Sequence, residues 1–417
     1  MTNEVTMSYG SEALRFNFEQ TPKIWNIHDP EQAIDGDIFQ NRLNTFLSQT
    51  SLNIKQPVVV VSDKTRLCGY PQYLPILLDT LIEMGADENR ISIYIAYGTH
   101  SPQSDVESRE AYGNAFLRGQ WHHHQCDDVT KSVELGRTFS GTPARVAARI
   151  MNASCLITFG AISHHYFAGY GGGRKLIFPG LGERQAIYAN HGLFLDRSER
   201  RLAAGCRSGR IRGNPLAEDL AQIEAFRPAD MAIHGILDSH GQVCDLLVGS
   251  GPKHFQAACA RHGSHCEVKG AEYDVVLASC GGFPKDINFI QSHKAIDNAA
   301  AFVRDGGRLI VLAQCRDGIG SDTFLPWFGM GSFDAAFDRL AENYEGNGGT
   351  ALSLMTKTRR ISIALVTELS QESTELIGIQ RLTADQAIEE VGTYKGQAAV
   401  IPNASMLVRQ WSETPQP

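Results

Sequence analysis

The sequence of 417 residues lacks the features that mark several classes of protein. Its 38 lysine and arginine residues are scattered among 46 acidic residues, so the formal net charge is −8 and no basic face is evident. This argues against nucleic-acid binding, which usually needs a concentrated basic surface. The apolar runs are far shorter than a membrane span, and the N-terminus has no charged segment followed by an apolar run. We therefore expect a cytoplasmic protein that binds neither nucleic acid nor membranes.

Paired cysteines are also missing. Nine cysteines are present, but no two of them form a CxxC motif. An odd number without regular spacing indicates reduced thiols, as in a cytoplasmic protein, rather than a disulfide framework or a cysteine zinc site.

The common nucleotide-binding motifs are absent as well. In the glycine-rich loop AGYGGGRK (168–175), Leu176 follows the lysine where a P-loop requires serine or threonine, and Arg174 occupies the position of the third glycine of GxGxxG. The loop can still bind a phosphate through its backbone N–H groups, and a structural turn is the alternative.

What is present is a regular alternation of short apolar runs and helical patterns. The runs at 57–63, 91–97 and 155–163 are continuous, as in strands buried on both faces of a parallel sheet, and the alternation returns from residue 273 onward. We predict an α/β protein with two doubly wound, Rossmann-like domains, residues 1–268 and 269–417, with mostly parallel sheets and a cleft between the domains.

Several local predictions accompany this architecture. Residues 31–47 and 143–151 have the spacing of helices, and the tail at 412–417 has the composition of a disordered segment. We place His122–His124 in a loop, although three consecutive histidines also resemble a metal-binding tract.

Polar clusters follow three of the predicted strands. Asp63 and Arg66 follow the first strand, His100 follows the second, and the stretch from His164 to His191 follows the third. Ligands of doubly wound sheets bind at the carboxyl ends of the strands, so these clusters predict a site. A salt bridge between Asp63 and Arg66 and ordinary surface or core histidines are the alternatives.

A further pair, Gln291 and Lys294, is expected on the second domain. The two residues are three positions apart on a predicted helix and therefore share a face, although such a lysine is most often simply solvated.

Together these clusters resemble the nickel-dependent lactate racemase family. The matching motifs are SDKTR at 62–66, GTH at 98–100, HYFAGYGGGRK at 165–175, the histidine at 191, and QSHK at 291–294. The resemblance implies a two-domain α/β enzyme with its active site between the domains. It also implies a nickel-pincer nucleotide cofactor, a pyridinium mononucleotide with two sulfur-containing arms.

The resemblance also implies roles for individual residues. His100 and His165 match a pair of acid/base histidines, and His191 matches a histidine ligand of nickel. Lys175 matches the lysine that holds the cofactor, either through a thioamide bond or noncovalently. Asp63 would order the site. The remaining implied contacts are Gly171, Gly172 and Gly173 with the cofactor, and Arg66, Gln291 and Lys294 with the substrate carboxylate.

The implied reaction is racemisation or epimerisation at C2 of a 2-hydroxy acid, either lactate or a larger hydroxy or sugar acid. Hydride moves reversibly between C2 and the cofactor while the two histidines exchange the hydroxyl proton. Cofactor-synthesis proteins are the implied partners. The oligomeric state and the roles of His164 and His122–His124 stay open. The alternatives are a zinc hydrolase or lyase with histidine ligands, and a ligand-binding homologue without catalytic activity.

Overall fold

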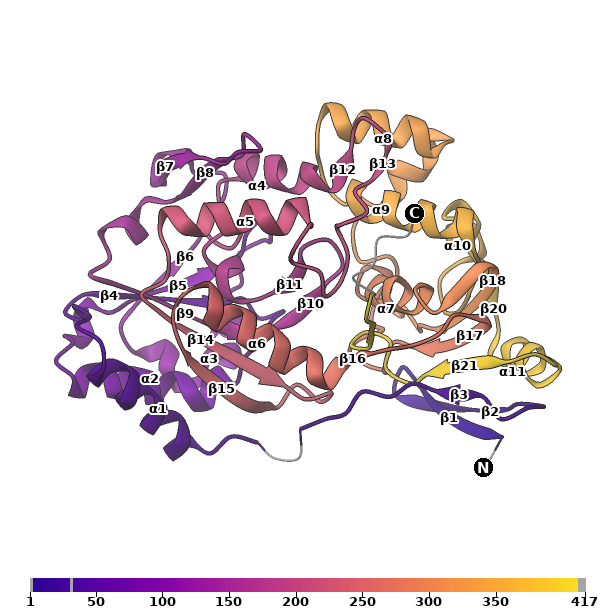
Figure 1. Ribbon diagram of the computed structural model, residues 1–417, viewed down its shortest axis with the longest axis horizontal. Helices are drawn as coiled ribbons and strands as arrows, with labels where there is room; N and C mark the ends of the chain where they lie inside the picture. The colour runs from indigo at the N-terminus through magenta and orange to yellow at the C-terminus, as the bar shows by residue number, and fades with distance from the viewer. Residues whose placement is uncertain (1–2, 31–32, 412–417) are drawn as a thin grey trace. The chain divides into compact units, whose positions relative to one another are not determined.

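The computed structural model describes residues 3–30 and 33–411 (Figure 1). The contacts between residues divide the chain into two compact units. The N-terminal unit comprises Asp29–Leu193 and Gly205–His265, and the C-terminal unit comprises Met1–His28, Phe194–Ala204 and Cys266–Pro417. This division differs from the single boundary at 268/269, because the first 28 residues and a short internal segment pack with the C-terminal part of the chain.

The N-terminal unit is built on a six-stranded sheet in the order β15-β14-β9-β4-β5-β6. All neighbouring strands are parallel except β14 and β15, which form an antiparallel hairpin. Because β5 continues the sheet on one side of β4 and β9 on the other, the topological switch point lies between β4 and β9. The strands are β4 (Pro57–Ser62), β5 (Ser92–Ala96), β6 (Gln120–His123), β9 (Cys155–Ala161), β14 (Met231–Leu237) and β15 (Val243–Gly249).

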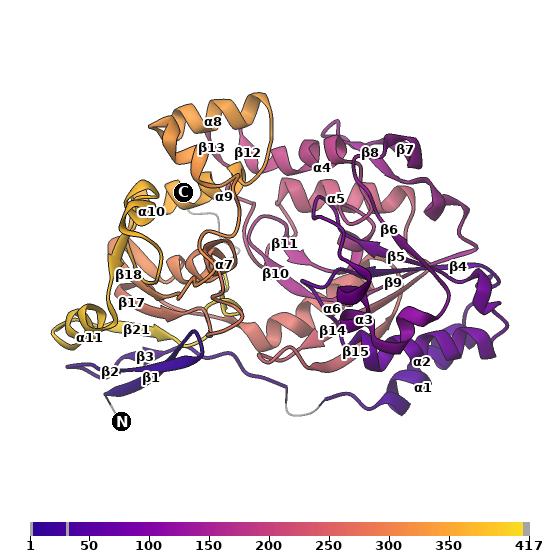
Figure 2. The ribbon, with the colours of Figure 1, turned by 180° about the vertical axis from the view of Figure 1, so that it is seen from behind.

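Helices cover both faces of this sheet (Figure 2). Every residue of β4 is buried, as the run PVVVVS predicts for a strand covered on both sides. Aromatic and aliphatic side chains of α1 and α2, including Phe39, Leu43 and Leu77, pack against the sheet and are 0% exposed. Each such side chain contributes about 1.5–3 kcal/mol on burial. The helices are α1 (Gly36–Ser48), α2 (Tyr70–Glu83), α3 (Asp105–Tyr112), α4 (Arg184–His191), α5 (Pro215–Phe226) and α6 (Gly251–Cys266).

The C-terminal unit contains a second six-stranded sheet, in the order β20-β19-β18-β17-β21-β3 and parallel throughout. Its strands are β17 (Tyr273–Ser279), β18 (Val303–Leu312), β19 (Ser362–Val366), β20 (Gln380–Leu382), β21 (Ala398–Ile401) and β3 (Lys23–Ile24). Its helices are α7 (Phe289–Ala300), α8 (Phe333–Glu342), α9 (Gly348–Arg360), α10 (Gln371–Leu376) and α11 (Ala384–Gly392). Two parallel-sheet units of this kind confirm the predicted α/β fold.

Short strand pairs complete the two units. The N-terminal hairpin packs on the second sheet, and its Val5, Met7, Phe16 and Phe18 belong to the core of that sheet. The pairs are β1 (Glu4–Tyr9) with β2 (Glu12–Asn17), β7 (Ser132–Arg137) with β8 (Pro143–Ala147), β10 (Ser163–His165) with β11 (Gly169–Gly171), β12 (Leu195–Asp196) with β13 (Arg201–Leu202), and β16 (Glu267–Val268) with β22 (Val408–Arg409).

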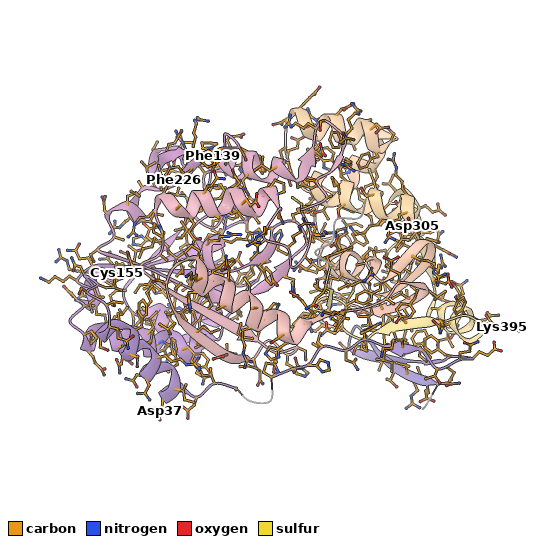
Figure 3. All side chains as sticks on the ribbon, viewed as in Figure 1. Asp37, Phe139, Cys155, Phe226, Asp305 and Lys395 are labelled. Atoms are coloured by element: carbon orange, nitrogen blue, oxygen red, sulfur yellow. The ribbon has the colours of Figure 1, made fainter. Side chains whose placement is uncertain are left out.

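The predicted helix over 143–151 is wrong. Residues 143–147 form β8, which pairs antiparallel with β7, and a 3-10 turn follows. The pair also has tertiary contacts, because Phe226 at the end of α5 (Figure 3) lies against Gly136 of β7. A Cβ at Gly136 would lie 2.5 Å from the Phe226 ring. Tertiary packing therefore overrides the local helical spacing.

The loop predicted at His122–His124 is wrong for His122 and His123, which belong to strand β6 (Gln120–His123) at the edge of the sheet, whereas His124 follows the strand. Backbone pairing with β5 and ring stacking decide this, because His122 stacks on Tyr94 and His123 stacks on Tyr97. The helix predicted over 31–47 is α1, which begins at Gly36. Residues 31–32 and the tail predicted to be disordered, 412–417, lie outside the described residues.

No helix within 3–30 and 33–411 combines the length and apolar character needed to cross a membrane. None of the nine cysteines forms a disulfide in this part of the chain.

Candidate active site

The three predicted polar clusters lie at the carboxyl ends of neighbouring strands. Asp63 directly follows β4, His100 follows β5, and the β10–β11 hairpin follows β9. These strands are adjacent and parallel in the order β9-β4-β5, so their ends meet at the switch point of the sheet. This is where doubly wound sheets bind ligands.

Asp63 and His100 are joined by a hydrogen bond. Nδ1 of His100 lies 2.7 Å from Oδ2 of Asp63, whose side chain is 4% exposed, whereas the His100 side chain is 45% exposed. The other carboxylate oxygen accepts hydrogen bonds from the backbone N–H and hydroxyl of Thr65 at 2.9 and 2.5 Å. Burial raises the pKa of Asp63, but hydrogen bonds from His100 and Thr65 outweigh it and lower that pKa to about 2. The carboxyl is therefore ionised at neutral pH, and the proton between the two groups lies on His100.

His165 ends β10 and has the opposite hydrogen-bonding pattern. Its Nδ1 accepts hydrogen bonds from the backbone N–H groups of Phe167 and Ala168, at 3.2 and 3.1 Å. The Tyr166 ring stacks on its imidazole at 5.3 Å with an interplanar angle of 4°. These contacts fix both the plane and the orientation of the ring.

The glycines that follow are required by the packing of their own backbone. Gly172 has a φ of 76°, and a Cβ there would lie 2.1 Å from the carbonyl oxygen of Ala161. A Cβ on Gly173, which has a φ of 51°, would lie 2.6 Å from the Phe255 ring of α6. A side chain fits at neither position, so the loop lies close against the end of β9 and against α6.

Lys175 and His191 are held in uncharged or easily neutralised states. Burial, together with the positive charges of Arg66 and Arg174, lowers the pKa of Lys175 to about 7. Burial, together with the charge of Lys175, lowers the pKa of His191 to about 3. Arg66 also contributes to the low pKa of Asp63. Asp63, Arg66, Lys175 and His191 therefore form one electrostatically coupled group within the N-terminal unit.

Helix α4 carries His191 as its last residue, and its first turn is anchored firmly. Glu183 caps the helix by accepting hydrogen bonds from the backbone N–H groups of residues 185 and 186, at 2.9 and 3.0 Å. Arg184 forms a bidentate ion pair with Asp127, with N–O distances of 2.6 and 2.8 Å. The segment after β6 thus fixes the helix that positions His191.

The predicted pair on the C-terminal unit is confirmed as a contact. Lys294 Nζ donates to Oε1 of Gln291 at 2.8 Å on α7. Asn288 caps the N-terminus of this helix, because its side chain accepts from the backbone N–H of Gln291 at 3.0 Å.

The zinc alternative gains no support from the described residues, which contain no group of three or more histidine, cysteine or acidic side chains placed to hold a metal. His122 and His123 stack on tyrosines, and His124 bonds to the carbonyl of Gly182 at 2.8 Å. His164 lies 3.2 Å from His262, ring nitrogen to ring nitrogen. The four histidines at 122, 123, 124 and 164 thus each contact another side chain or a backbone carbonyl.

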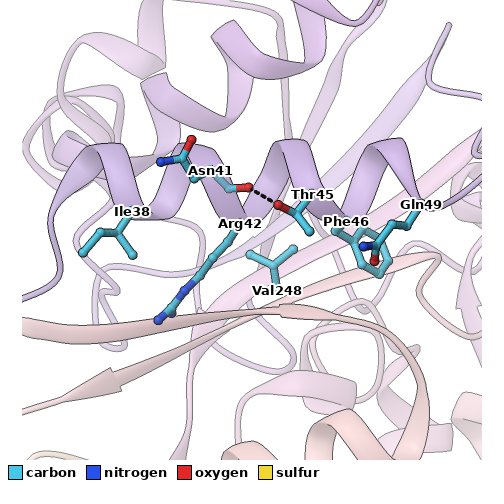
Figure 4. A pocket seen from close by; sticks show the side chains of 7 residues that line it. All are labelled: Ile38, Asn41, Arg42, Thr45, Phe46, Gln49 and Val248. Carbon is cyan, nitrogen blue, oxygen red and sulfur yellow. Dashed lines mark hydrogen bonds between the residues drawn. The ribbon is translucent and has the colours of Figure 1, made fainter.

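A surface groove of about 390 Å³ lies elsewhere on the N-terminal unit, between α1 and β15 (Figure 4). None of the predicted site residues lines it. The residues that line it are Ile38, Asn41, Arg42, Thr45, Phe46, Gln49 and Val248.

Sequence reasoning missed two buried residues that connect the site loops, Tyr97 and Gln103. Gln103 is 5% exposed, and its Oε1 accepts from the backbone N–H of Lys64 at 2.9 Å. Gln103 follows the GTH motif by three positions, but no local pattern marks a glutamine in a loop as buried.

Comparison with known proteins identifies relatives over most of the chain. The chain matches the lactate racemase N-terminal domain over residues 12–203 and the lactate racemase C-terminal domain over residues 268–347. It is 30% identical over 301 residues to a lactate racemase of Thermoanaerobacterium thermosaccharolyticum, a match covering 72% of this chain and 68% of that one. A lactate racemase of Lactiplantibacillus plantarum is 30% identical over 298 residues, covering 70% and 67% of the two chains.

Solved structures show the same fold. The lactate racemase apoprotein from Thermoanaerobacterium thermosaccharolyticum superposes with a TM-score of 0.87 and 24% sequence identity, covering 98% of this chain and 100% of that one. A protein from Thermotoga maritima superposes with a TM-score of 0.67 and 12% identity. Matching domains, relatives and fold lead to one conclusion: the chain belongs to the lactate racemase family and is an isomerase of the racemase type.

Proposed function

We propose that this protein inverts the C2 stereocentre of a 2-hydroxy acid, either lactate or a larger hydroxy or sugar acid. Both relatives named above are lactate racemases, which makes lactate the first substrate to test. The observation that carries the proposal is the opposite hydrogen bonding of His100 and His165 at one edge of the sheet.

The two histidines are suited to complementary roles. Asp63 accepts a hydrogen bond from the Nδ1–H group of His100. The neutral ring therefore has its lone pair on Nε2, where it can accept a proton. Because two backbone N–H groups donate to Nδ1 of His165, the proton of that neutral ring lies on Nε2. One neutral ring therefore presents a proton acceptor and the other a hydrogen-bond donor. To deliver a proton, His165 must first become an imidazolium ion, and the N–H groups of Phe167 and Ala168 must then turn away from Nδ1. The roles of the two histidines exchange in the reverse direction.

The residues around Lys175 fit the nickel-pincer nucleotide that the family requires. A neutral imidazole is the form that binds a metal, and His191 is kept neutral. Because the described residues supply no cluster of three protein ligands, the ion must bring most of its own donors, as a pincer does. When bound, the cofactor would supply a hydride acceptor for the hydrogen on C2. His191 would complete the metal coordination, and Gly171, Gly172 and Gly173 would lie against the nucleotide.

Lys175 would hold the cofactor. With a pKa of about 7, a substantial fraction of its amine is uncharged at neutral pH, which is the nucleophilic form. Both covalent attachment and noncovalent retention use this residue. Intact mass after loading separates the two, because only a covalent bond survives denaturation.

The substrate carboxylate would be bound by Arg66, Gln291 and Lys294. Arginine provides a planar fork of donors that suits a carboxylate, whereas lysine provides a point charge. Fixing the carboxylate leaves only the C2 substituents to exchange positions. Cofactor-synthesis proteins are the proposed partners, since the cofactor must be delivered to the protein.

The test is to load the protein with the nickel cofactor and to screen chiral 2-hydroxy acids for loss of optical activity or formation of the C2 epimer. His100→Ala and His165→Ala should each abolish interconversion while leaving the circular dichroism spectrum unchanged. His240→Ala, in the exposed turn between β14 and β15, is the matched control. Full activity in either site variant would remove that histidine from the proposed mechanism.

A further inference from the structure

Strand β6 carries the histidine tract that the proposed chemistry does not use. His122 stacks on Tyr94 with ring centroids 4.6 Å apart, and His123 stacks on Tyr97 at 5.8 Å. Only His123 adds a hydrogen bond to its stacking partner, since its Nδ1 lies 2.7 Å from the Tyr97 hydroxyl. The tract therefore places one histidine in direct contact with the loop that carries His100.

The Tyr97 hydroxyl connects His123 to a buried glutamine. It accepts a hydrogen bond from the backbone N–H of Gln103 at 3.2 Å and forms a second hydrogen bond with Nδ1 of His123 at 2.7 Å. Tyr97 is 3% exposed, and burial raises its pKa to about 12, which keeps the hydroxyl protonated at neutral pH.

The side chain of Gln103 forms a hydrogen bond with the neighbouring loop, which follows β4. Its Oε1 accepts from the backbone N–H of Lys64 at 2.9 Å, and its Nε2 donates to the Ser108 hydroxyl at 3.1 Å. Lys64 directly follows Asp63. One glutamine side chain thus ties the loop after β5 to the loop after β4.

His100 lies between Tyr97 and Gln103, the two residues that the hydrogen bond from the Gln103 backbone to the Tyr97 hydroxyl joins. Its backbone N–H donates to the carbonyl of Tyr97 at 3.1 Å, and its ring is 45% exposed. Because the imidazole is so exposed, packing restrains it only weakly. The position of the ring therefore depends on its bond to Asp63 and on the two loops that carry the pair.

We propose that His123, Tyr97 and Gln103 form a positioning network that keeps Asp63 and His100 at hydrogen-bonding distance. His123 bonds to the Tyr97 hydroxyl, the hydroxyl holds the backbone of Gln103, and the Gln103 side chain holds the loop that carries Asp63. The proposal rests on the proposed function in assigning a catalytic consequence to this geometry. Displacement of a catalytic group by about 1 Å can lower a rate by up to roughly a hundredfold.

The test uses variants that remove either the Tyr97 hydroxyl or the ring nitrogens of His123. Tyr97→Phe deletes the bridging hydroxyl, and His123→Phe keeps the stacked ring but deletes Nδ1. His123→Asn restores a polar group close to the position of Nδ1. Tyr94→Phe and His122→Phe are matched controls, because they alter a second tyrosine–histidine stack between the same two strands.

Two measurements separate positioning from catalysis. In the metal-free protein, ¹⁵N-histidine NMR reports the hydrogen-bonded Nδ1 proton of His100, assigned by its loss in His100→Gln. Tyr97→Phe and His123→Phe should broaden or shift this signal, whereas His123→Asn and both controls should leave it in place. In the loaded enzyme, the first two variants should lower kcat about tenfold with KM unchanged, and His123→Asn should recover most of the loss.

An unchanged His100 signal in Tyr97→Phe would overturn the proposal, as would a loss of kcat equally large in the two control variants. If the loaded protein racemises no 2-hydroxy acid, the proposed function fails, and the NMR comparison alone still decides whether the network positions His100.

Discussion

At the scale of single residues, the neighbours of each ionisable group set its charge. Asp63 is buried but stays ionised because His100 and Thr65 donate to it. Lys175 is half-buried, and desolvation together with the charges of Arg66 and Arg174 lowers its pKa to about 7. Loss of solvent therefore accompanies a fixed anion at one position and a titratable amine at another.

Replacing Asp63 by asparagine should reduce turnover sharply. The amide keeps an acceptor for Thr65 but presents either an N–H group or a weaker acceptor to His100, which favours the wrong tautomer of the imidazole. We expect kcat to fall by roughly 10²–10⁴-fold, measured by loss of optical rotation with the loaded enzyme. Thr65→Val serves as the control for local disruption, and near-normal kcat in Asp63→Asn would contradict the role assigned to the carboxylate.

A buried histidine should make the protein sensitive to mild acid. His234 on β14 is 2% exposed, its Nδ1 has no hydrogen-bond partner, and burial with the nearby His254 lowers its pKa from 6.5 to about 3. Below pH 6.5 the unfolded chain binds a proton that the folded chain does not, so this residue's contribution to stability is complete above that pH and lost as the pH falls towards 3.

His234→Phe should weaken this dependence, because a phenyl ring can occupy the site without titrating. Between pH 6.5 and about 5, the free energy of unfolding of the wild type should fall by about 2 kcal/mol more than that of the variant. Urea unfolding of the metal-free proteins across this range measures the difference. Parallel curves for the two proteins would show that His234 takes up its proton equally in both states.

At the scale of elements, the glycine-rich loop at 168–175 is shaped by contacts with the end of β9 and with α6. Backbone oxygens and an aromatic ring occupy the space where side chains at 172 and 173 would lie. The glycines therefore have a structural cause before any ligand is considered. They place Lys175 on the short 3-10 turn that follows.

Gly172→Ala should destabilise the loop. The new Cβ would lie 2.1 Å from a backbone oxygen at a φ of 76°, which we expect to cost at least about 2 kcal/mol. Gly192→Ala is the control, because Gly192 has a φ of −61° and no atom within 4 Å of the new Cβ. Thermal unfolding and the nickel retained after desalting should both fall in the first variant only. Wild-type nickel retention in Gly172→Ala would show that the loop does not position the cofactor.

At the scale of the whole molecule, the start of the chain belongs to the unit formed by its end. Strand β3 pairs with β21, and the backbone N–H of Trp25 donates to the carbonyl of Val400 at 2.9 Å. Met7 and Phe16 of the N-terminal hairpin are 1% and 0% exposed in the core of the second sheet. The second unit is therefore completed by residues far away in sequence.

A fragment of residues 266–411 should not fold by itself. Loss of Val5, Met7, Phe16 and Phe18 from the core removes roughly 6–12 kcal/mol of apolar burial, comparable with the whole stability of a domain. Joining residues 3–28 to this fragment through a flexible linker should restore a cooperative unfolding transition, monitored by circular dichroism. Cooperative unfolding of the shorter fragment would support a boundary near 268 instead.

Residues with a strong local pattern were predicted well. Three continuous apolar runs form the strands that precede Asp63, His100 and His164. Such runs are predicted to be buried from their composition alone. The helix expected over 143–151 and the loop expected at His122–His124 failed because pairing with β7 and β5 decided those segments. Gln103 was missed because its importance lies in a contact with Lys64, 39 positions away in sequence.

The sequence by itself determined the two parallel-sheet units and the family, because strand burial and motif spacing are local properties. The tertiary structure alone decided that the first 28 residues complete the second unit, that the glycines of the loop pack on β9 and α6, and that His123 reaches the loop of His100. The reason is physical: hydrogen bonds and packing join residues that are distant in sequence, and no local pattern encodes which distant surface a residue will meet.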